Sequence, residues 1–338
     1  MKKILYISYR KVVESILGTT NFILALLDMQ ILNKREIEYT KTQSKTLALF
    51  YDNIISDENI LKKGVGCVIF SMDRPMQLHA LLGSLLDKLS SPIPIFVIYR
   101  YTNEKYEETY KNDILLYSDK LVTFVKQGGE KTFKDDLIKV LWTIDTDRLF
   151  FLVDDILVTE YIDTQDLGEF DCERGVLSLR LGMNLQASYN AREAQPLPTF
   201  IPQARDDGKI FWIWNKGKYD WNYPLSVDGH VFSTKEMLAM TRSISFNSPN
   251  TFESNLQIFR PVFDFRYGLA YNKSRLFNIP CNKVQNDNTN RHGKMHQDEL
   301  LKKWNEGYQI DYKSVYGFQN TGAHQEIAFN FIKRINDK

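Results

Sequence analysis

The stretch Leu149-Phe150-Phe151-Leu152-Val153-Asp154-Asp155 decides the fold class of this chain of 338 residues. An apolar run without alternation is typical of a strand buried on both faces, as in parallel sheets that are covered by helices. Asp154 and Asp155 follow at the carboxyl end of the strand, where open α/β sheets bind ligands. Adjacent carboxylates repel each other, and a divalent cation that carries phosphates is the usual compensating charge. A solvated acidic turn is the alternative interpretation.

Strands and helices alternate along the chain before this stretch. Apolar runs predict strands, and apolar residues at helical spacing predict helices; in chain order the predicted elements are 65–70 (strand), 75–89 (helix), 94–99 (strand), 103–117 (helix), 121–125 (strand) and 132–144 (helix). This alternation with short connections predicts right-handed crossovers and a mostly parallel central sheet flanked by helices. Residues 1–62 have a helical pattern, and the half after residue 160 is irregular.

Composition limits the classes of partner and compartment. The formal net charge is +1, from 43 basic and 42 acidic residues, which gives no bulk electrostatic reason to expect nucleic acid as a partner. The three cysteines match no metal-binding spacing and favour a reducing compartment. The first residues lack a signal-peptide core, so we expect a cytoplasmic protein. The basic amphipathic start favours either peripheral contact with the inner face of the membrane or packing of a helix on the main domain.

Two motifs that bind nucleotides through glycine-rich loops are absent. Neither Gly-x-Gly-x-x-Gly nor a Walker-type loop follows the first predicted strand, which disfavours a dinucleotide fold and a phosphate-loop ATPase. The strand instead leads into Ser71-Met72-Asp73-Arg74-Pro75. This segment, the leucine-rich helix after it and the later Asp154-Asp155 together resemble the GT-A-fold nucleotide-sugar glycosyltransferases, in particular the family-two-like enzymes of bacterial polysaccharide synthesis. The resemblance covers about 64–160 and is weaker to about 305.

The resemblance implies a GT-A-like α/β fold with three parts. Residues 1–62 would be a helical N-terminal extension, and 63–338 a catalytic domain. Within that domain, 63–160 would bind the nucleotide sugar and 161–338 the acceptor. The implied cofactor is Mn²⁺ or Mg²⁺, which would neutralise the departing diphosphate. The implied partners are a nucleotide-sugar donor, with UDP the commonest carrier, and a glycan or lipid-linked glycan acceptor; the oligomeric state is left open.

The resemblance also implies a role for individual residues. Asp155 and His292 would bind the metal, with His296 as a competitor for His292, and Glu253 would be the general base, with Asp228 in reserve. The remaining predicted contacts are to the donor (Ser71, Asp73, Arg74, Asp135, Asp154 and Gly229) and to the acceptor (Trp214 and Trp221).

Structural roles are the competing interpretation for most of these residues. Asp73 and Asp135 fit the first turn or cap of a helix, and Glu253 fits the N-terminal part of one. Gly229 fits a β-turn, and the tryptophans fit the core of a hairpin.

The leading functional hypothesis is an inverting, metal-dependent glycosyltransferase that takes part in surface-polysaccharide synthesis. Sugar nucleotidyl transfer is a second hypothesis, but it would normally require a glycine-rich basic loop after the first strand. A non-catalytic carbohydrate-binding or scaffold protein with a degenerate GT-A fold is the third hypothesis. Asp154-Asp155 argues against it, because a scaffold has no need of a cation site.

Overall fold

The computed structural model describes residues 34–58, 60–128, 131–202, 208–280 and 296–334. The predicted membrane contact of the basic N-terminus lies outside these residues. The chain divides into two compact units, Met1–Ala48 and Leu49–Lys338. No helix in the described ranges combines the length and the apolar character that crossing a membrane requires.

The first half alternates strands and helices, as the sequence predicts. The elements are α2 (Lys34–Ser56), β1 (Lys62–Met72), α3 (Pro75–Lys88), β2 (Ile95–Arg100), η2 (Glu104–Tyr106), α4 (Glu107–Tyr117), β3 (Val122–Lys126), α5 (Phe133–Thr143) and β4 (Thr146–Val153). Local chemistry sets several of these bounds. Pro75 opens α3, where its missing N–H costs nothing, and Thr132 forms a capping box with Asp135 at the start of α5.

The second half consists of shorter elements. They are β5 (Ile156–Val158), α6 (Thr164–Glu169), β6 (Gly175–Ser178), β7 (Ala187–Ser188), β8 (Glu193–Ala194), β9 (Lys209–Ile213), η3 (Trp214–Lys216), η4 (Tyr219–Asn222), β10 (His230–Ser233), α7 (Thr234–Ser243), α8 (Pro249–Leu256), η5 (Gln257–Phe259), α9 (Arg260–Phe263), β11 (Tyr267–Tyr271), β12 (Leu276–Asn278), α10 (Gln297–Asn305), β13 (Tyr308–Ile310), η6 (Tyr312–Val315) and β14 (Phe331–Lys333).

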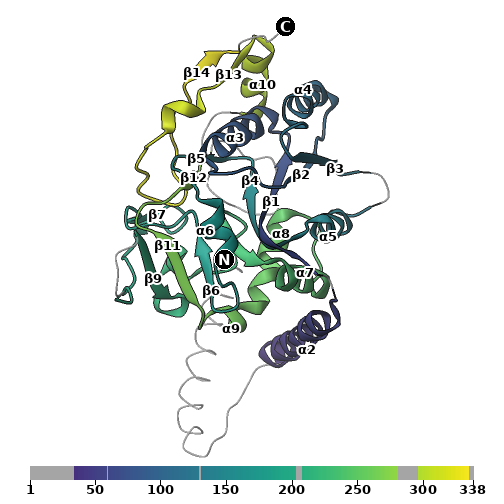
Figure 1. The fold of residues 1–338 in the computed structure, drawn as a ribbon, viewed down its shortest axis with the longest axis vertical. Helices are drawn as coiled ribbons and strands as arrows, with labels where there is room; N and C mark the ends of the chain where they lie inside the picture. The colour runs from purple at the N-terminus through teal and green to yellow at the C-terminus, as the bar shows by residue number, and fades with distance from the viewer. Residues whose placement is uncertain (1–33, 59, 129–130, 203–207, 281–295, 335–338) are drawn as a thin grey trace, which may run out of the picture. The chain divides into compact units, whose positions relative to one another are not determined.

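One eight-stranded sheet organises the second unit, in the order β3-β2-β1-β4-β10-β6-β11-β9 (Figure 1). The first four of these strands are parallel, whereas β10 runs antiparallel to both β4 and β6. The predicted α/β fold with a mostly parallel sheet is therefore confirmed, and the irregular half contributes the mixed part of the sheet. The assignment of 63–338 as a catalytic domain stays a prediction.

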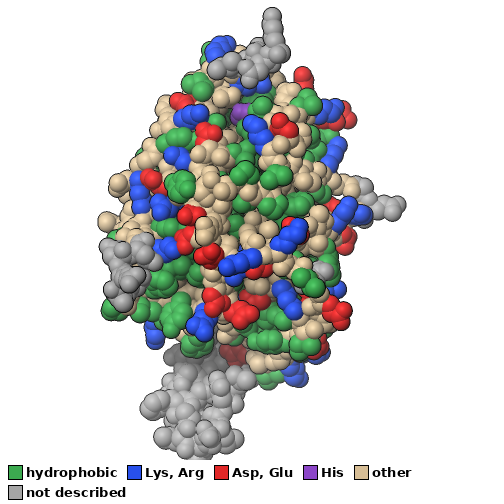
Figure 2. All heavy atoms as spheres, viewed as in Figure 1, with side chains coloured by type: hydrophobic (Ala, Val, Ile, Leu, Met, Phe, Trp, Pro, Cys, Tyr) green, Lys and Arg blue, Asp and Glu red, His purple; other side chains and the backbone are tan. Residues whose placement is uncertain are grey.

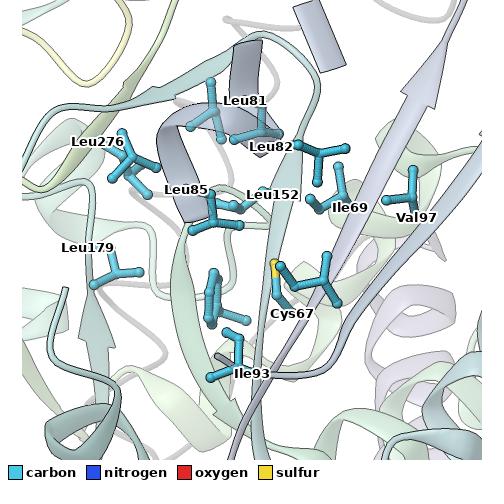
Figure 3. Packing of buried hydrophobic residues seen from close by; sticks show 14 of the residues in the cluster. Cys67, Ile69, Leu81, Leu82, Leu85, Ile93, Val97, Leu152, Leu179 and Leu276 are labelled. Atoms are coloured by element: carbon cyan, nitrogen blue, oxygen red, sulfur yellow. The ribbon is translucent and has the colours of Figure 1, made fainter. Parts of the chain in front are cut away.

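Helices cover both faces of the parallel strands. On one face, leucines of α3 pack against Cys67 and Ile69 of β1 and Leu152 of β4 (Figure 3). On the other face, the ring of Phe151 lies 5.8 Å from that of Phe252 in α8. Burial on both faces explains the unbroken apolar run of β4, because Leu149, Phe150, Phe151 and Leu152 are all 0% exposed.

The C-terminal segments extend this arrangement beyond the end of β4. Strand β5 follows directly after Asp154 and Asp155, and pairs antiparallel with β12, with Asn278 opposite Ile156. An isolated bridge then joins Asn278 to His324. Residues 155, 278 and 324 are thus brought together by backbone pairing at the carboxyl end of the sheet, although the sequence separates them widely.

Candidate active site

Asp154 and Asp155, here called the aspartate pair, share one guanidinium group. Arg74 Nη1 lies 3.0 Å from Asp154 Oδ1 and 3.2 Å from Asp155 Oδ2. The backbone N–H of Met72 donates a further hydrogen bond of 3.0 Å to Asp154 Oδ2. The predicted contact of Arg74 with the donor therefore stays a prediction, and the two carboxylates are among its observed partners.

Burial dominates the electrostatics of the aspartate pair. It raises the pKa of Asp154 to about 6, although the Arg74 charge acts in the opposite direction. Burial also raises the pKa of Asp155, against the same Arg74 charge. Burial raises the pKa values of both aspartates more than the Arg74 charge lowers them. A further positive charge would therefore stabilise the ionised form of the aspartate pair.

A cavity of about 380 Å³ lies beside the aspartate pair, at the carboxyl ends of β1, β2 and β4. This first cavity is lined by polar and aromatic side chains: Ser71, Arg74, Arg100, Thr102, Gln127, Phe133, Asp154, Asn247, Ser248 and Asn250 are among them. A cavity in which apolar walls carry a few convergent polar groups is typical of a small-molecule site. Its position matches the sequence-based expectation for a ligand of an open α/β sheet.

The two predicted donor contacts at the end of β1 have structural partners. Ser71 lines the first cavity, and its hydroxyl lies 2.8 Å from the Tyr110 hydroxyl. Asp73 accepts two hydrogen bonds of 2.7 Å from the backbone N–H and the hydroxyl of Thr102. Asp73 also has a positive φ of 55°, a strained conformation for a residue other than glycine. Its carboxylate thus fixes the loop that forms one wall of the first cavity.

Arg180 stands at the centre of a second group of acids. Its guanidinium pairs with Asp228 at 2.9 Å and with Asp220 at 3.0 Å, and it donates to the Ser226 hydroxyl. Glu253 adjoins this group, because its Oε1 accepts from the same Ser226 hydroxyl at 3.0 Å. We call Asp220, Asp228 and Glu253 with Arg180 the acidic cluster.

The titration of the acidic cluster suits proton transfer. Burial and then the neighbouring Asp228 charge raise the pKa of Glu253 to about 7. Burial also raises the pKa of Asp228, although Arg180 opposes the shift. The two predicted base candidates therefore belong to one cluster. Helix α8 links that cluster to the first cavity, since its opening residues Ser248 and Asn250 line the cavity and its next turn carries Glu253.

Asn278 and His324 lie between the aspartate pair and the acidic cluster. Asn278 Nδ2 donates to Asp155 Oδ1 at 3.3 Å, and Asn278 Oδ1 is buried without a hydrogen-bond partner among the described atoms. His324 Nε2 lies 3.8 Å from Asp228 Oδ2. Burial, followed by the Arg180 charge, lowers the pKa of His324 to about 4, so its imidazole is neutral at pH 7.

Several predicted contacts are not brought to this site. Trp214 and Trp221 are 0% exposed and pack edge-on against Trp212, so neither ring presents a face to an acceptor. Burial of these rings, which the hairpin-core alternative anticipates, removes the basis for acceptor stacking. Asp135 is exposed, and its Oδ2 accepts from Thr132 N at 2.9 Å as a helix cap. His292 lies outside the described residues.

Gly229 and His296 have local structural partners. Gly229 has a φ of 78°, and its N–H donates to Phe151 O at 2.7 Å, which ties the residue to β4. An added Cβ would lie 3.1 Å from the Leu276 side chain. The predicted donor contact of Gly229 stays a prediction. His296 caps α10 by accepting from Asp298 N at 3.2 Å.

Four residues of the site were missed in the sequence: Arg180, Asp220, Asn278 and His324. The position of Arg180 in Val-Leu-Ser-Leu-Arg-Leu, a lone charge within an apolar stretch, is a signal of a buried ion pair. Asn278 and His324 have no comparable signal, because their neighbours carry no periodicity or motif.

The site contains some of the ligand atoms that a divalent cation needs. No group of three or more His, Cys, Asp or Glu side chains in the described ranges is arranged to bind a metal ion. An unpartnered amide oxygen on Asn278, the Asp155 carboxylate and a neutral imidazole on His324 are nevertheless adjacent in the fold. These atoms fit a cation that accepts oxygen and nitrogen ligands. The Arg74 guanidinium supplies the positive charge at the aspartate pair.

The comparisons with known proteins gave structural similarities alone. No protein-family model and no curated protein sequence matches the chain. A solved structure of S. aureus TarS 1-349 is 13% identical with a TM-score of 0.42, covering 64% of this chain and 60% of its own. GalNAc-T7 with UDP, GalNAc and Mn²⁺ is 11% identical with a TM-score of 0.41, covering 66% and 44%. The chain thus spans less than two thirds of these proteins.

A third solved structure is a 4-diphosphocytidyl-2C-methyl-D-erythritol synthase from Anaerococcus prevotii. It is 14% identical with a TM-score of 0.36, covering 64% of this chain and 90% of its own. These solved structures are similar to the chain in fold, and each has a TM-score below 0.5.

Proposed function

We propose that this protein is a glycosyltransferase that moves a sugar from a nucleoside-diphosphate sugar to a glycan acceptor, with inversion, in the synthesis of a surface polysaccharide. The observation that supports the proposal most directly is the joint position of the aspartate pair and the first cavity at the carboxyl end of β4. A nucleoside in the first cavity would direct its diphosphate toward Arg74 and the aspartate pair. Arg100 would add positive charge at the wall of the same cavity.

The residues of the acidic cluster suit the proton transfer that this reaction needs. An inverting transfer requires a base that accepts the proton of the acceptor hydroxyl while the glycosidic bond to the diphosphate breaks. Glu253, whose pKa is about 7, is matched to that task at neutral pH. Asp228 is the reserve candidate, but its salt bridge with Arg180 at 2.9 Å makes it a weaker proton acceptor.

A divalent cation, Mn²⁺ or Mg²⁺, is proposed at Asp155, with Asn278 and His324 as further ligands in place of the predicted His292. When bound, such a cation would neutralise the charge that develops on the leaving diphosphate. Arg74 would have to leave the aspartate pair as the cation binds, since its guanidinium contacts both carboxylates at 3.0 and 3.2 Å. The released guanidinium is then available to the phosphates, to which arginine binds well.

A thermal-shift screen tests this proposal. UDP, GDP, CDP and ADP are each added with and without Mn²⁺, to the wild-type chain and to Asp155→Ala. A ligand at about a hundred times its Kd stabilises the native state by about 2.7 kcal/mol, which is readily measured. We expect one nucleoside diphosphate to stabilise the wild type in a manner that depends on Mn²⁺ and is lost in Asp155→Ala.

Other outcomes would favour the competing hypotheses. Equal stabilisation with and without Mn²⁺ would favour a non-catalytic binding protein. Turnover of a nucleoside triphosphate with release of pyrophosphate would favour nucleotidyl transfer. The absence of any nucleotide-dependent shift would contradict the proposal.

A further inference from the structure

A second cavity, of about 530 Å³, adjoins His324 and shares no lining residue with the first. Two segments that are far apart in the sequence form it: the β7–β8 hairpin at 186–194 and the C-terminal segment at 321–326. Its volume lies within the range of about 300–1,000 Å³ that is usual for ligand pockets. The proposed donor binds in the first cavity, and no ligand is yet assigned to the second cavity.

Backbone hydrogen bonds fix the two walls of the second cavity relative to each other. The N–H groups of Gln186 and Ala187 both donate to Thr321 O, at 2.8 and 2.9 Å. Gln195 N donates to Gln186 O at 2.7 Å and closes the hairpin. A cavity held by such bonds is preformed, so a ligand would not have to order it.

The second cavity and the acidic cluster share a wall. His324 lines the cavity, and its Nε2 lies 3.8 Å from Asp228 Oδ2. At the other end of the hairpin, the Gln195 side chain accepts from Asp220 N at 3.0 Å. A ligand at the His324 end of the cavity would therefore lie near Asp228, the reserve base candidate of the acidic cluster.

An aromatic ring and a carboxylate stand in a fixed relation within the second cavity. The Tyr189 ring is half-buried and stacks on the His324 imidazole, with centroids 6.3 Å apart and planes at 26°. The Tyr189 hydroxyl donates to Glu326 Oε1 at 2.6 Å. An aromatic face next to a positioned carboxylate is suited to a sugar ring, which offers an apolar C–H face and hydroxyl donors.

The other charged residues at the cavity limit the kind of sugar. Glu193 also lines the cavity and accepts from the Tyr219 hydroxyl. Arg192 has a positive φ of 58°, an uncommon conformation for arginine that places it at the turn of the hairpin. With Glu326, the two carboxylates outnumber the single guanidinium among the charged lining side chains, so the cavity favours an uncharged ligand over a phosphorylated one.

We infer that the second cavity binds the acceptor as an uncharged pyranose residue, with Tyr189 under its ring and its reacting end toward His324 and the acidic cluster. The inference rests on the proposed function, since only a transfer between two substrates calls for a second cavity beside the acidic cluster. It assigns the acceptor to the β7–β8 hairpin and not to the buried tryptophans.

Saturation-transfer difference NMR on the full chain tests the assignment without requiring turnover. The probes are the methyl glycosides of glucose, galactose and N-acetylglucosamine, each with and without UDP. Tyr189→Leu removes the aromatic face and leaves a smaller apolar side chain, and Tyr189→Phe keeps the face and removes the hydroxyl. UDP-dependent thermal stabilisation of each variant reports whether it folds and whether the donor site is intact.

We expect at least one glycoside to bind the wild type and to remain bound when UDP is added. Its affinity should fall about tenfold in Tyr189→Leu and change little in Tyr189→Phe, as the loss of an aromatic contact implies. Absence of binding by all three glycosides, displacement by UDP, or unchanged binding in Tyr189→Leu would overturn the inference. Failure of UDP to bind the wild type would instead contradict the proposed function.

Discussion

The replacement Glu253→Gln separates stability from catalysis at the acidic cluster. Both hydrogen bonds that Glu253 accepts, from Ser226 Oγ at 3.0 Å and from Val227 N at 3.1 Å, end on the same oxygen, Oε1. A glutamine can place its carbonyl oxygen there and keep both bonds. The substitution then removes only the charge, so its effect on stability follows from the pKa of Glu253.

The expected effect depends on pH in a defined direction. The pKa of Glu253 is about 7 in the folded protein, against an ordinary value of 4.5. Below the ordinary value the carboxyl is protonated in both states, and its contribution to stability is fully present. That contribution is lost as the pH rises through 7, because the folded state must then bury the charge. A pKa unit corresponds to about 1.4 kcal/mol, so the loss is about 3 kcal/mol.

Glu253→Gln should therefore unfold about 6 °C higher than the wild type at about pH 8, and at the same temperature at about pH 4. Scanning calorimetry across this pH range measures the difference. The matched control is Glu173→Gln, a substitution of an exposed side chain, which should show no pH-dependent difference. A Glu253→Gln variant that is no more stable than the wild type at the higher pH would refute the reasoning.

The same variant should lose transfer activity if Glu253 is the base. General bases contribute about 10²–10⁴-fold, so the rate of sugar transfer should fall by that factor while UDP binding is retained. Retention of the transfer rate would leave Asp228 as the candidate base.

Three further predictions follow from individual contacts. Arg74→Gln should lower the Kd for Mn²⁺ about tenfold in calorimetric titration, because the competing guanidinium leaves the aspartate pair; weaker Mn²⁺ binding would contradict this. Gly229→Ala should destabilise the protein by about 2 kcal/mol in urea unfolding, because its φ of 78° is left-handed and the new Cβ would lie 3.1 Å from the Leu276 side chain. Trp221→Leu should cost about 3 kcal/mol through the cavity that it leaves, with glycoside binding unchanged; reduced glycoside binding at unchanged stability would restore an acceptor role for this ring.

The face of the protein that Figure 2 shows carries charged side chains of both signs. Lysine and arginine side chains are interspersed with aspartate and glutamate over the face shown in Figure 2, without an extended patch of one sign. A chain with a net charge of +1 has no large excess of charge to concentrate.

The first half of the fold was predictable because its signals are local. The apolar run before Asp154 is typical of a strand covered on both faces, and alternation with helices favoured a parallel sheet. The position of the aspartate pair at the carboxyl end of the sheet follows from the same two facts. The tryptophans show the limit of such reasoning, because a cluster of aromatic residues has the same sequence pattern whether its rings are buried or exposed.

Asn278 and His324 reach the site through pairing between distant segments, which local sequence patterns do not predict. Asp155 meets Asn278 because β5 pairs with β12, and Asn278 meets His324 through one further bridge. Each pairing selects one register among several, and a shift of one residue would turn a different side chain toward the aspartate pair. A sequence reading that sought a C-terminal histidine could therefore find His292 as easily as His324. If Asn278→Leu leaves the Mn²⁺ affinity unchanged, these pairings serve only to close the sheet, and the cation site must be sought elsewhere.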